Sequence, residues 1–131
     1  MIIQEEILKD WQLNVGASED AIRISIAKLG CSLPPDYVQF FREHDGGEGF
    51  VGDNYLILWS VEDLAPFNHE YEVEQYAPGI LLFGSNGGGE GYGFDMNDTE
   101  MSIVRIPFIG MDRLYAIPVA RSFSGLFSNL Q

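Results

Sequence analysis

The sequence predicts an α+β fold in which helices pack against a single antiparallel β-sheet. Apolar residues recur at helical spacing through the first third of the 131-residue chain. Short apolar runs separated by glycine or asparagine turns then follow, which is the pattern of a β-meander. The last residues return to helical spacing. Helices before and after a block of strands are typical of the α+β class.

Two helices are expected at the start of the chain. The range 5–13 can form a short helix, because its apolar residues share one face. A longer helix should follow Ser18, which is a preferred N-cap residue. It should end at Gly30, since glycine readily terminates a helix.

A third helix is expected to begin at Pro34-Pro35, since proline is tolerated in the first turn of a helix. Three aromatic residues then recur at helical spacing, namely Tyr37, Phe40 and Phe41. The helix should close at residues 45–47. We expect a glycine- and acid-rich turn from there to Asp53.

The second half of the chain is expected to form the sheet. Short apolar runs predict strands at 55–59, 80–83, 92–94, 101–108 and 115–119. The acidic stretch 68–77 between them can be read either as helix or as loop. Ser122 can cap a final helix whose apolar residues recur at i, i+3, i+4 and i+7.

The most unusual segment is a glycine run, which we define as residues 83–96. It holds six glycines in fourteen residues, and each would cost roughly 1 kcal/mol against alanine in a helix. With apolar residues on both sides, the run predicts a β-hairpin around a glycine turn. It contains no Lys, His or Cys. The run therefore indicates binding or architecture rather than catalysis.

The composition predicts one domain covering residues 1–131. A hydrophobic fraction of 46% and 17 aromatic residues support a packed core. No apolar run approaches the roughly 20 residues that span a bilayer, and the acidic start of the chain does not resemble a signal peptide. The single cysteine, Cys31, excludes an intramolecular disulfide. We therefore expect a cytoplasmic protein.

The charge of the chain is strongly negative and unevenly distributed. The net charge is −13, and the range 43–104 contains thirteen Asp and Glu residues with no Lys or Arg. Such a chain is not expected to bind nucleic acid or an anionic membrane, because both require positive charge. The acidic range has two readings, a solvated surface that keeps the protein soluble or a face that steers a basic partner.

Catalytic and metal-binding motifs are not recognisable. Residues 47–52 formally match a dinucleotide fingerprint, but they follow a helix whereas that motif must follow a strand. Residues 95–100 begin like a calcium loop but lack the later ligands. His44 and His69 stand alone, and a structural role is favoured for Cys31. We expect no enzyme activity, no cofactor and no metal site.

Three stretches together resemble the SUKH superfamily, which includes the fungal cell-wall assembly regulator Smi/Knr and many small bacterial proteins. The resemblance covers about residues 15–130. It rests on Leu33-Pro34-Pro35-Asp36-Tyr37 with Phe40-Phe41 and Asp45-Gly46-Gly47, on Tyr76-Ala77-Pro78-Gly79 leading to the glycine run, and on Ala120, Ser122-Phe123 and Phe127.

The resemblance implies an α+β fold with one antiparallel sheet and a protein-binding function without enzyme activity. Many bacterial members are immunity proteins that neutralise a cognate toxin, often a nuclease or deaminase, and a 131-residue chain fits that type. The alternative is a regulatory module or a small-ligand-binding module with a pocket beside the glycine hairpin. A pocket of several hundred Å³ there would favour the alternative, and a convex acidic face would favour the inhibitor.

For an immunity protein, the expected partner is a basic toxin domain, contacted by acidic side chains of the first loop and of the hairpin. Tyr92 would anchor that contact if it were exposed. However, alternation along the strand places it on the same side as Phe94, and burial of both is favoured. The candidate contact residues are Asp45, Glu48, Asp53, Glu90, Tyr92 and Asp95.

Overall fold

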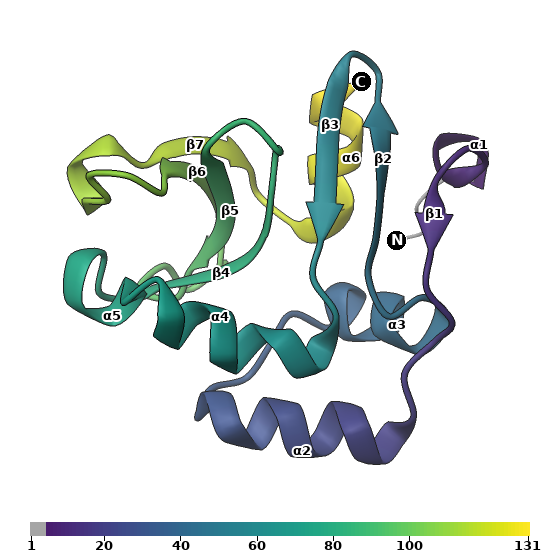
Figure 1. Ribbon diagram of the computed structural model, residues 1–131, viewed down its shortest axis with the longest axis horizontal. Coiled ribbons are helices and arrows are strands. Elements are labelled where there is room, and N and C mark those ends of the chain that lie inside the picture. The colour runs from purple at the N-terminus through teal and green to yellow at the C-terminus, as the bar shows by residue number, and fades with distance from the viewer. Residues whose placement is uncertain (1–4) are drawn as a thin grey trace.

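Seven strands form one antiparallel sheet in the order β1 to β7, so each strand pairs with its neighbours in the sequence (Figure 1). The computed structural model describes residues 5–131. Residues 1–4, part of the start that was compared with a signal peptide, lie outside the described residues. The strands are β1 (Gln12–Leu13), β2 (Gly47–Val51), β3 (Asn54–Leu58), β4 (Ile80–Ser85), β5 (Glu90–Asp95), β6 (Ile103–Pro107) and β7 (Ile117–Ala120).

The helices precede, interrupt and follow the strands, which confirms the predicted α+β class. The α-helices are α1 (Glu5–Leu8), α2 (Glu19–Leu29), α3 (Pro35–Glu43), α4 (Leu64–Glu70), α5 (Val73–Tyr76) and α6 (Phe123–Leu130). Two 3₁₀ turns complete the list, η1 (Val61–Asp63) and η2 (Arg113–Tyr115). The stretch 68–77, which had two readings, is therefore mostly helical.

The predicted helix caps are confirmed. Ser18 Oγ accepts a hydrogen bond from the Ala21 N–H at 3.1 Å, and Ser122 Oγ accepts one from the Gly125 N–H at 3.0 Å. Gly30 ends α2 in the left-handed conformation, with φ 71°. These termini depend on neighbouring residues alone, so the sequence is enough to predict them.

Two local predictions are wrong for one shared reason. The helix expected over 5–13 ends at Leu8, and the turn expected over 47–53 is mostly strand β2. A Cβ atom at Gly49 would overlap the indole ring of Trp11, and the Trp11 Nε1–H donates to the Phe50 carbonyl at 2.9 Å. Gly49 therefore lies in a strand because it admits the tryptophan, and β1 pairs with β2 beside it.

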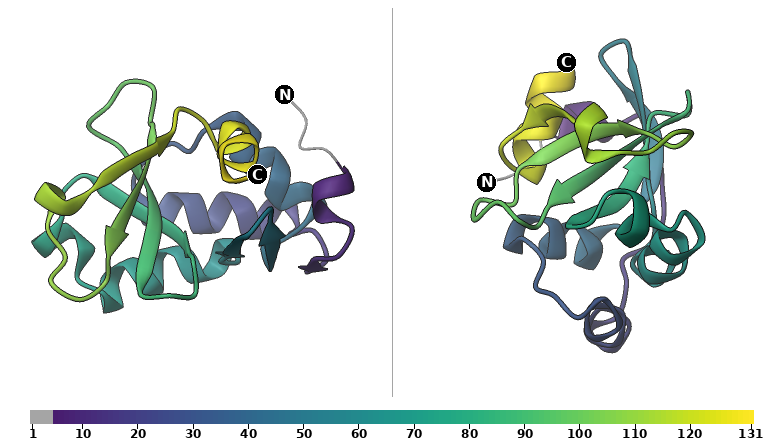
Figure 2. Two further views of the ribbon diagram at one scale, coloured as in Figure 1. Left: turned by 90° about the horizontal axis from the view of Figure 1, so that it is seen from above. Right: turned by 90° about the vertical axis from the view of Figure 1, so that its left-hand side faces the viewer.

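The core covers both faces of the sheet where β4 to β6 lie. On one face, the ring of Tyr37 contacts four phenylalanines at centroid distances of 4.6 to 5.5 Å, namely Phe41, Phe83, Phe94 and Phe123. On the other face, Leu82, Val104 and Ile106 pack with Val73 of α5. Figure 2 accordingly shows α6 and α5 on opposite sides of these strands.

On its β4 side, the β2–β3 hairpin is joined to the sheet by only two residue pairs, Ile57 with Ser85 and Leu58 with Gly84. Beyond that junction, the Asn68 side chain takes the place of a strand partner for β4. It accepts from the Leu82 N–H at 2.9 Å and donates to the Leu82 carbonyl at 2.8 Å. The hairpin therefore diverges from β4 and stands apart in Figure 1.

Candidate protein-binding surface

The β2–β3 hairpin buries one face and leaves the other open. Its inward residues include Val51, Leu56 and Leu58, all of which belong to the core. Because side chains alternate along a strand, the residues between them point outward. We call this outward side the hairpin face, and it consists of Glu48, Phe50, Tyr55 and Ile57.

Tyr55 connects the other polar and aromatic groups of the hairpin face. Its hydroxyl donates to Glu48 Oε2 at 2.5 Å, and its ring lies edge-on to Phe50 with centroids 4.9 Å apart. The Glu48 carboxylate, through this hydrogen bond, raises the pKa of Tyr55. The Phe50 side chain remains 63% exposed although it has this aromatic neighbour. The hairpin face thus combines a carboxylate with an exposed ring.

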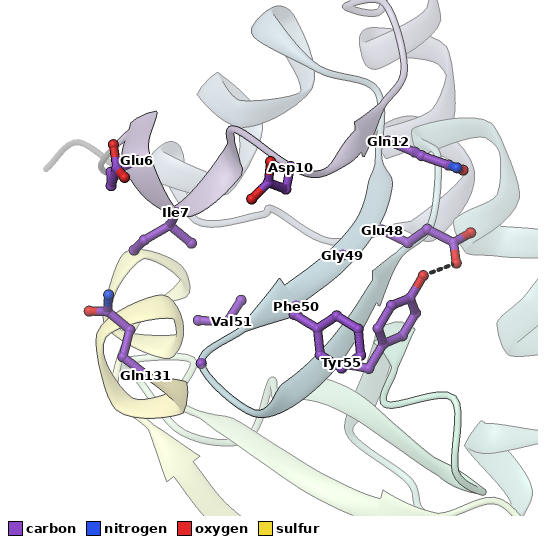
Figure 3. Close-up of a pocket in the computed structure, with 11 residues that line it drawn as sticks. Glu6, Ile7, Asp10, Gln12, Glu48, Gly49, Phe50, Val51, Tyr55 and Gln131 are labelled. Carbon is purple, nitrogen blue, oxygen red and sulfur yellow. Dashed lines mark hydrogen bonds between the residues drawn. The ribbon is translucent and has the colours of Figure 1, made fainter.

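Two grooves flank the hairpin face. The larger one, of about 560 Å³, lies between α1, β2 and the end of α6, as Figure 3 shows. The smaller one, of about 280 Å³, reaches toward Trp59 and Asp63. Gln12 and Glu48 line both grooves, so Glu48 lies on the ridge between them.

The charge of both grooves is negative. Glu6 and Asp10 line the larger groove, Asp63 lines the smaller one, and Glu48 lines both. None of the residues described as lining either groove is Lys or Arg. Lys9 pairs with Glu6 at 2.9 Å, but both side chains are mostly exposed and the pair is therefore weak. A positively charged group is the ligand that this surface would attract.

Of the acids predicted as contacts, Glu48 and Asp53 lie on or beside the hairpin face. Glu48 is half-buried in β2, and Asp53 is exposed in the turn between β2 and β3. The same turn is held by Asn54, whose amide donates to the Leu130 carbonyl at the end of α6 at 2.8 Å. The hairpin tip, which carries Asp53, is thereby fixed to α6.

Asp45 stabilises the local fold through two hydrogen bonds. Its carboxylate accepts a hydrogen bond from the Val61 N–H at 2.8 Å, at the start of the η1 turn, and its carbonyl accepts from the Asn14 side chain at 2.8 Å. Burial, together with the nearby Glu62 and Asp63, raises the pKa of Asp45, while the Val61 hydrogen bond opposes the shift. The carboxylate therefore serves the junction between β3 and α4.

Glu90 and Asp95 are engaged by cations of the chain itself. Glu90 Oε2 lies 3.1 Å from Arg105 Nε, and Asp95 Oδ2 lies 2.8 Å from an Arg113 guanidinium nitrogen. Asn86 also donates to Glu90 at 3.1 Å across the glycine turn. Both carboxylates stabilise the β4–β6 region, and neither offers a free negative charge to a partner.

Tyr92 must be removed from the candidate contacts. Its role as an anchor depends on exposure, and its side chain is only 2% exposed. It faces the core side of β5 with Phe94, as the alternation of the strand requires. Burial and the nearby Glu90 raise the pKa of the Tyr92 hydroxyl, while Arg105 lowers it. The residue stabilises the fold.

The aromatic half of the hairpin face, and the acids Glu6 and Asp10 of the larger groove, were not among the residues predicted from the sequence. Phe50 gave no signal because residues 47–53 were expected to form a turn, and Tyr55, although it was placed in the predicted strand 55–59, then had no partner strand before it. Treating 47–51 as a strand would have placed Glu48 and Phe50 together on one face. That alternation is the signal that could have located the surface.

Two other kinds of site, a metal site and a reactive thiol, can be assessed in the part of the chain that the structure describes. Among residues 5–131, no three or more His, Cys, Asp or Glu side chains gather in a way that could hold a metal ion. Burial raises the pKa of the Cys31 thiol, which is the opposite of what a reactive thiolate needs. Within the same range, no helix combines the length and apolar character required to cross a membrane.

The meander sheet, the aromatic core and the β2–β3 hairpin with its open outward side define an α+β protein. The chain belongs to the SMI1/KNR4 family (SUKH-1), whose family model matches residues 16–129. This confirms the resemblance to the SUKH superfamily. The family is generally non-enzymatic and is associated with protein–protein interactions. No curated protein sequence matches the chain.

Proposed function

We propose that this protein is an immunity-type protein that binds and neutralises a basic toxin domain through its hairpin face. The observation that supports the proposal is the exposed Phe50 beside Glu48, between two grooves whose described lining contains acids but no cation. Family membership provides the general setting of protein–protein interaction.

The charge distribution supports a basic partner. Five of the seven Lys and Arg residues form ion pairs with acids of the chain itself, namely Lys9, Arg23, Arg42, Arg105 and Arg113. The fifteen acids left without such partners outnumber the two remaining cations by thirteen, which is the net charge of −13. Toxin domains that act on nucleic acid carry positive charge for phosphate binding, so an acidic protein can steer toward that surface and cover it.

The proposal is tested with the product of the adjacent open reading frame. We expect that product to be toxic when expressed alone, to be tolerated when co-expressed with this protein, and to form a complex measurable by calorimetry. The proposal fails if the neighbouring product neither binds nor is toxic. A purified, catalytically inactive variant of the product provides the material for the affinity measurements.

Charge reversal locates the contact. The double variant Asp10→Lys, Glu48→Lys should weaken the complex at least about tenfold, mainly by slowing association. Glu70→Lys, Glu74→Lys, which makes the same change in net charge at exposed positions of α4 and α5, should alter the affinity much less. If both variants weaken binding equally, the net charge matters and the hairpin face does not.

The second candidate is a regulatory or small-ligand-binding module. The larger groove, at about 560 Å³, has the size of a small-molecule site. However, its described lining includes α1 and β2 and none of the glycines of the glycine run. Two results together would favour this module over the immunity protein. The protein would show a saturable thermal shift with a small cationic compound, and it would not bind the product of the adjacent open reading frame.

A further inference from the structure

We propose that Glu48, Tyr55 and Phe50 form a binding site for an arginine guanidinium group on the surface of a protein partner. The inference rests on the proposed function, because it names the chemical group that the hairpin face recognises. Three observations carry it, namely the state of the Glu48 carboxylate, the setting of the Phe50 ring and the position of both relative to the grooves.

The Glu48 carboxylate is oriented but not neutralised. Among the described residues, it accepts one side-chain hydrogen bond, from the Tyr55 hydroxyl to Oε2, and it forms no ion pair. Glu90 and Asp95, by contrast, each lie within 3.1 Å of an arginine nitrogen of the same chain. Because Tyr55 holds one oxygen in place, Glu48 can accept charge-assisted hydrogen bonds from an incoming cation with little loss of side-chain entropy.

The Phe50 ring is pre-positioned as a platform. It follows Glu48 by two residues on the same face of β2, and the Tyr55 ring supports it edge-on at an interplanar angle of 77°. Arginine is the cation that fits such a pair, since its planar guanidinium can lie on an aromatic ring while its N–H groups bind a carboxylate. A lysine ammonium is compact and more strongly hydrated, so it gains less from the ring.

The grooves favour the approach of a partner that carries the arginine. Glu48 lies on the ridge between two acidic depressions, with Asp10 on one side and Asp63 on the other (Figure 3 shows the Asp10 side). A protruding side chain can reach the ridge while its backbone and neighbours occupy the grooves. Charge complementarity therefore assigns the surface to an arginine-bearing protein segment.

The site can be tested without knowing the partner, by titrating the isotope-labelled full chain with N-acetyl-arginine amide and recording amide spectra. We expect saturable shifts at Glu48, Phe50 and Tyr55, with an affinity in the millimolar range. N-acetyl-lysine amide should bind more weakly. N-acetyl-citrulline amide, which keeps the shape but lacks the charge, should give no localised shifts. Shifts spread evenly over the acidic residues of the chain, or no saturation, would overturn the proposal.

Three variants separate the contributions. Phe50→Leu keeps an apolar side chain but loses the ring, and it should weaken arginine binding about two- to fivefold. Glu48→Gln keeps an acceptor for Tyr55 and removes the charge, and it should abolish the localised shifts. Glu100→Gln is the control, and it should leave them unchanged. Equal binding by Phe50→Leu and the unaltered protein would show that the ring has no role.

The outcomes for the site and for the function are distinguishable. If N-acetyl-arginine amide gives localised shifts but the product of the adjacent open reading frame does not bind, the arginine site is supported and the immunity function is overturned. A toxin complex that tolerates both Phe50→Leu and Glu48→Gln without loss of affinity would keep the function and overturn the site.

Discussion

Asp45 carries its carboxylate in a half-buried position, where it accepts a hydrogen bond from the Val61 N–H at 2.8 Å. Burial and the neighbouring Glu62 and Asp63 raise its pKa in the folded state. A raised pKa means that the folded state binds the proton more tightly than the unfolded state does. The stability that Asp45 contributes is therefore present at low pH and lost as the pH rises through the folded-state pKa.

The variant Asp45→Asn tests the direction of this pH dependence of stability. An asparagine keeps an oxygen for the Val61 N–H but removes the half-buried charge. We expect equal free energies of unfolding for the two proteins near pH 3.5, and a more stable variant at pH 7. Urea titrations between these pH values measure the difference. Asp53→Asn, in an exposed turn, is the control and should change little at either pH. A less stable Asp45→Asn at pH 7 would show that the charge-assisted hydrogen bond outweighs burial.

At the scale of elements, the glycine run is a hairpin whose glycines have separate tasks. Gly84 belongs to one of the two pairs that join β3 to β4, and a Cβ there would overlap the Ile57 carbonyl oxygen. Gly88 lies in the turn, where a Cβ would meet nothing closer than 3.5 Å. The run thus supports the architecture that its composition indicates, although only some of its glycines are irreplaceable.

The paired variants Gly84→Ala and Gly88→Ala measure this difference. The first should lower the free energy of unfolding by about 3 kcal/mol, because the backbone of β3 must move away to admit the methyl group. The second should change it by no more than about 0.5 kcal/mol. Chemical denaturation monitored by tryptophan fluorescence gives both values. Similar losses in the two variants would mean that the close approach at Gly84 is not what holds the junction.

Element by element, the predictions succeeded where local residues decide the structure. Ser18 and Ser122 cap helices through hydrogen bonds to residues three positions away, so a short window of sequence contains the whole cause. Strand β2 depends on Trp11, which lies far away in the sequence, and a local reading of its glycines therefore predicts a turn. The exposure of Phe50 was unpredictable for the same reason, since it follows from which side of β2 packs on the core.

At the scale of the whole molecule, negative charge is the dominant electrostatic feature. The net charge is −13, and the five ion pairs of the described residues are at least partly exposed. Exposed pairs contribute little, whereas repulsion among the remaining acids opposes the compact state. This balance predicts that salt stabilises the protein, because screening weakens the repulsion more than it weakens the pairs.

The melting temperature should therefore rise by a few degrees when the sodium chloride concentration increases from about 0.01 M to about 0.15 M. That rise corresponds to an increase of about 1 kcal/mol in the free energy of unfolding. The variant Glu70→Lys, Glu74→Lys changes the net charge from −13 to −9 at two exposed positions, and its salt response should be smaller. Differential scanning calorimetry of both proteins provides the comparison. A melting temperature that falls with salt would show that the ion pairs outweigh the repulsion. If the melting temperature rises with salt, a basic partner that covers the acidic surface should relieve the same repulsion and so stabilise the fold. The affinity of that partner should itself decrease as the salt concentration increases.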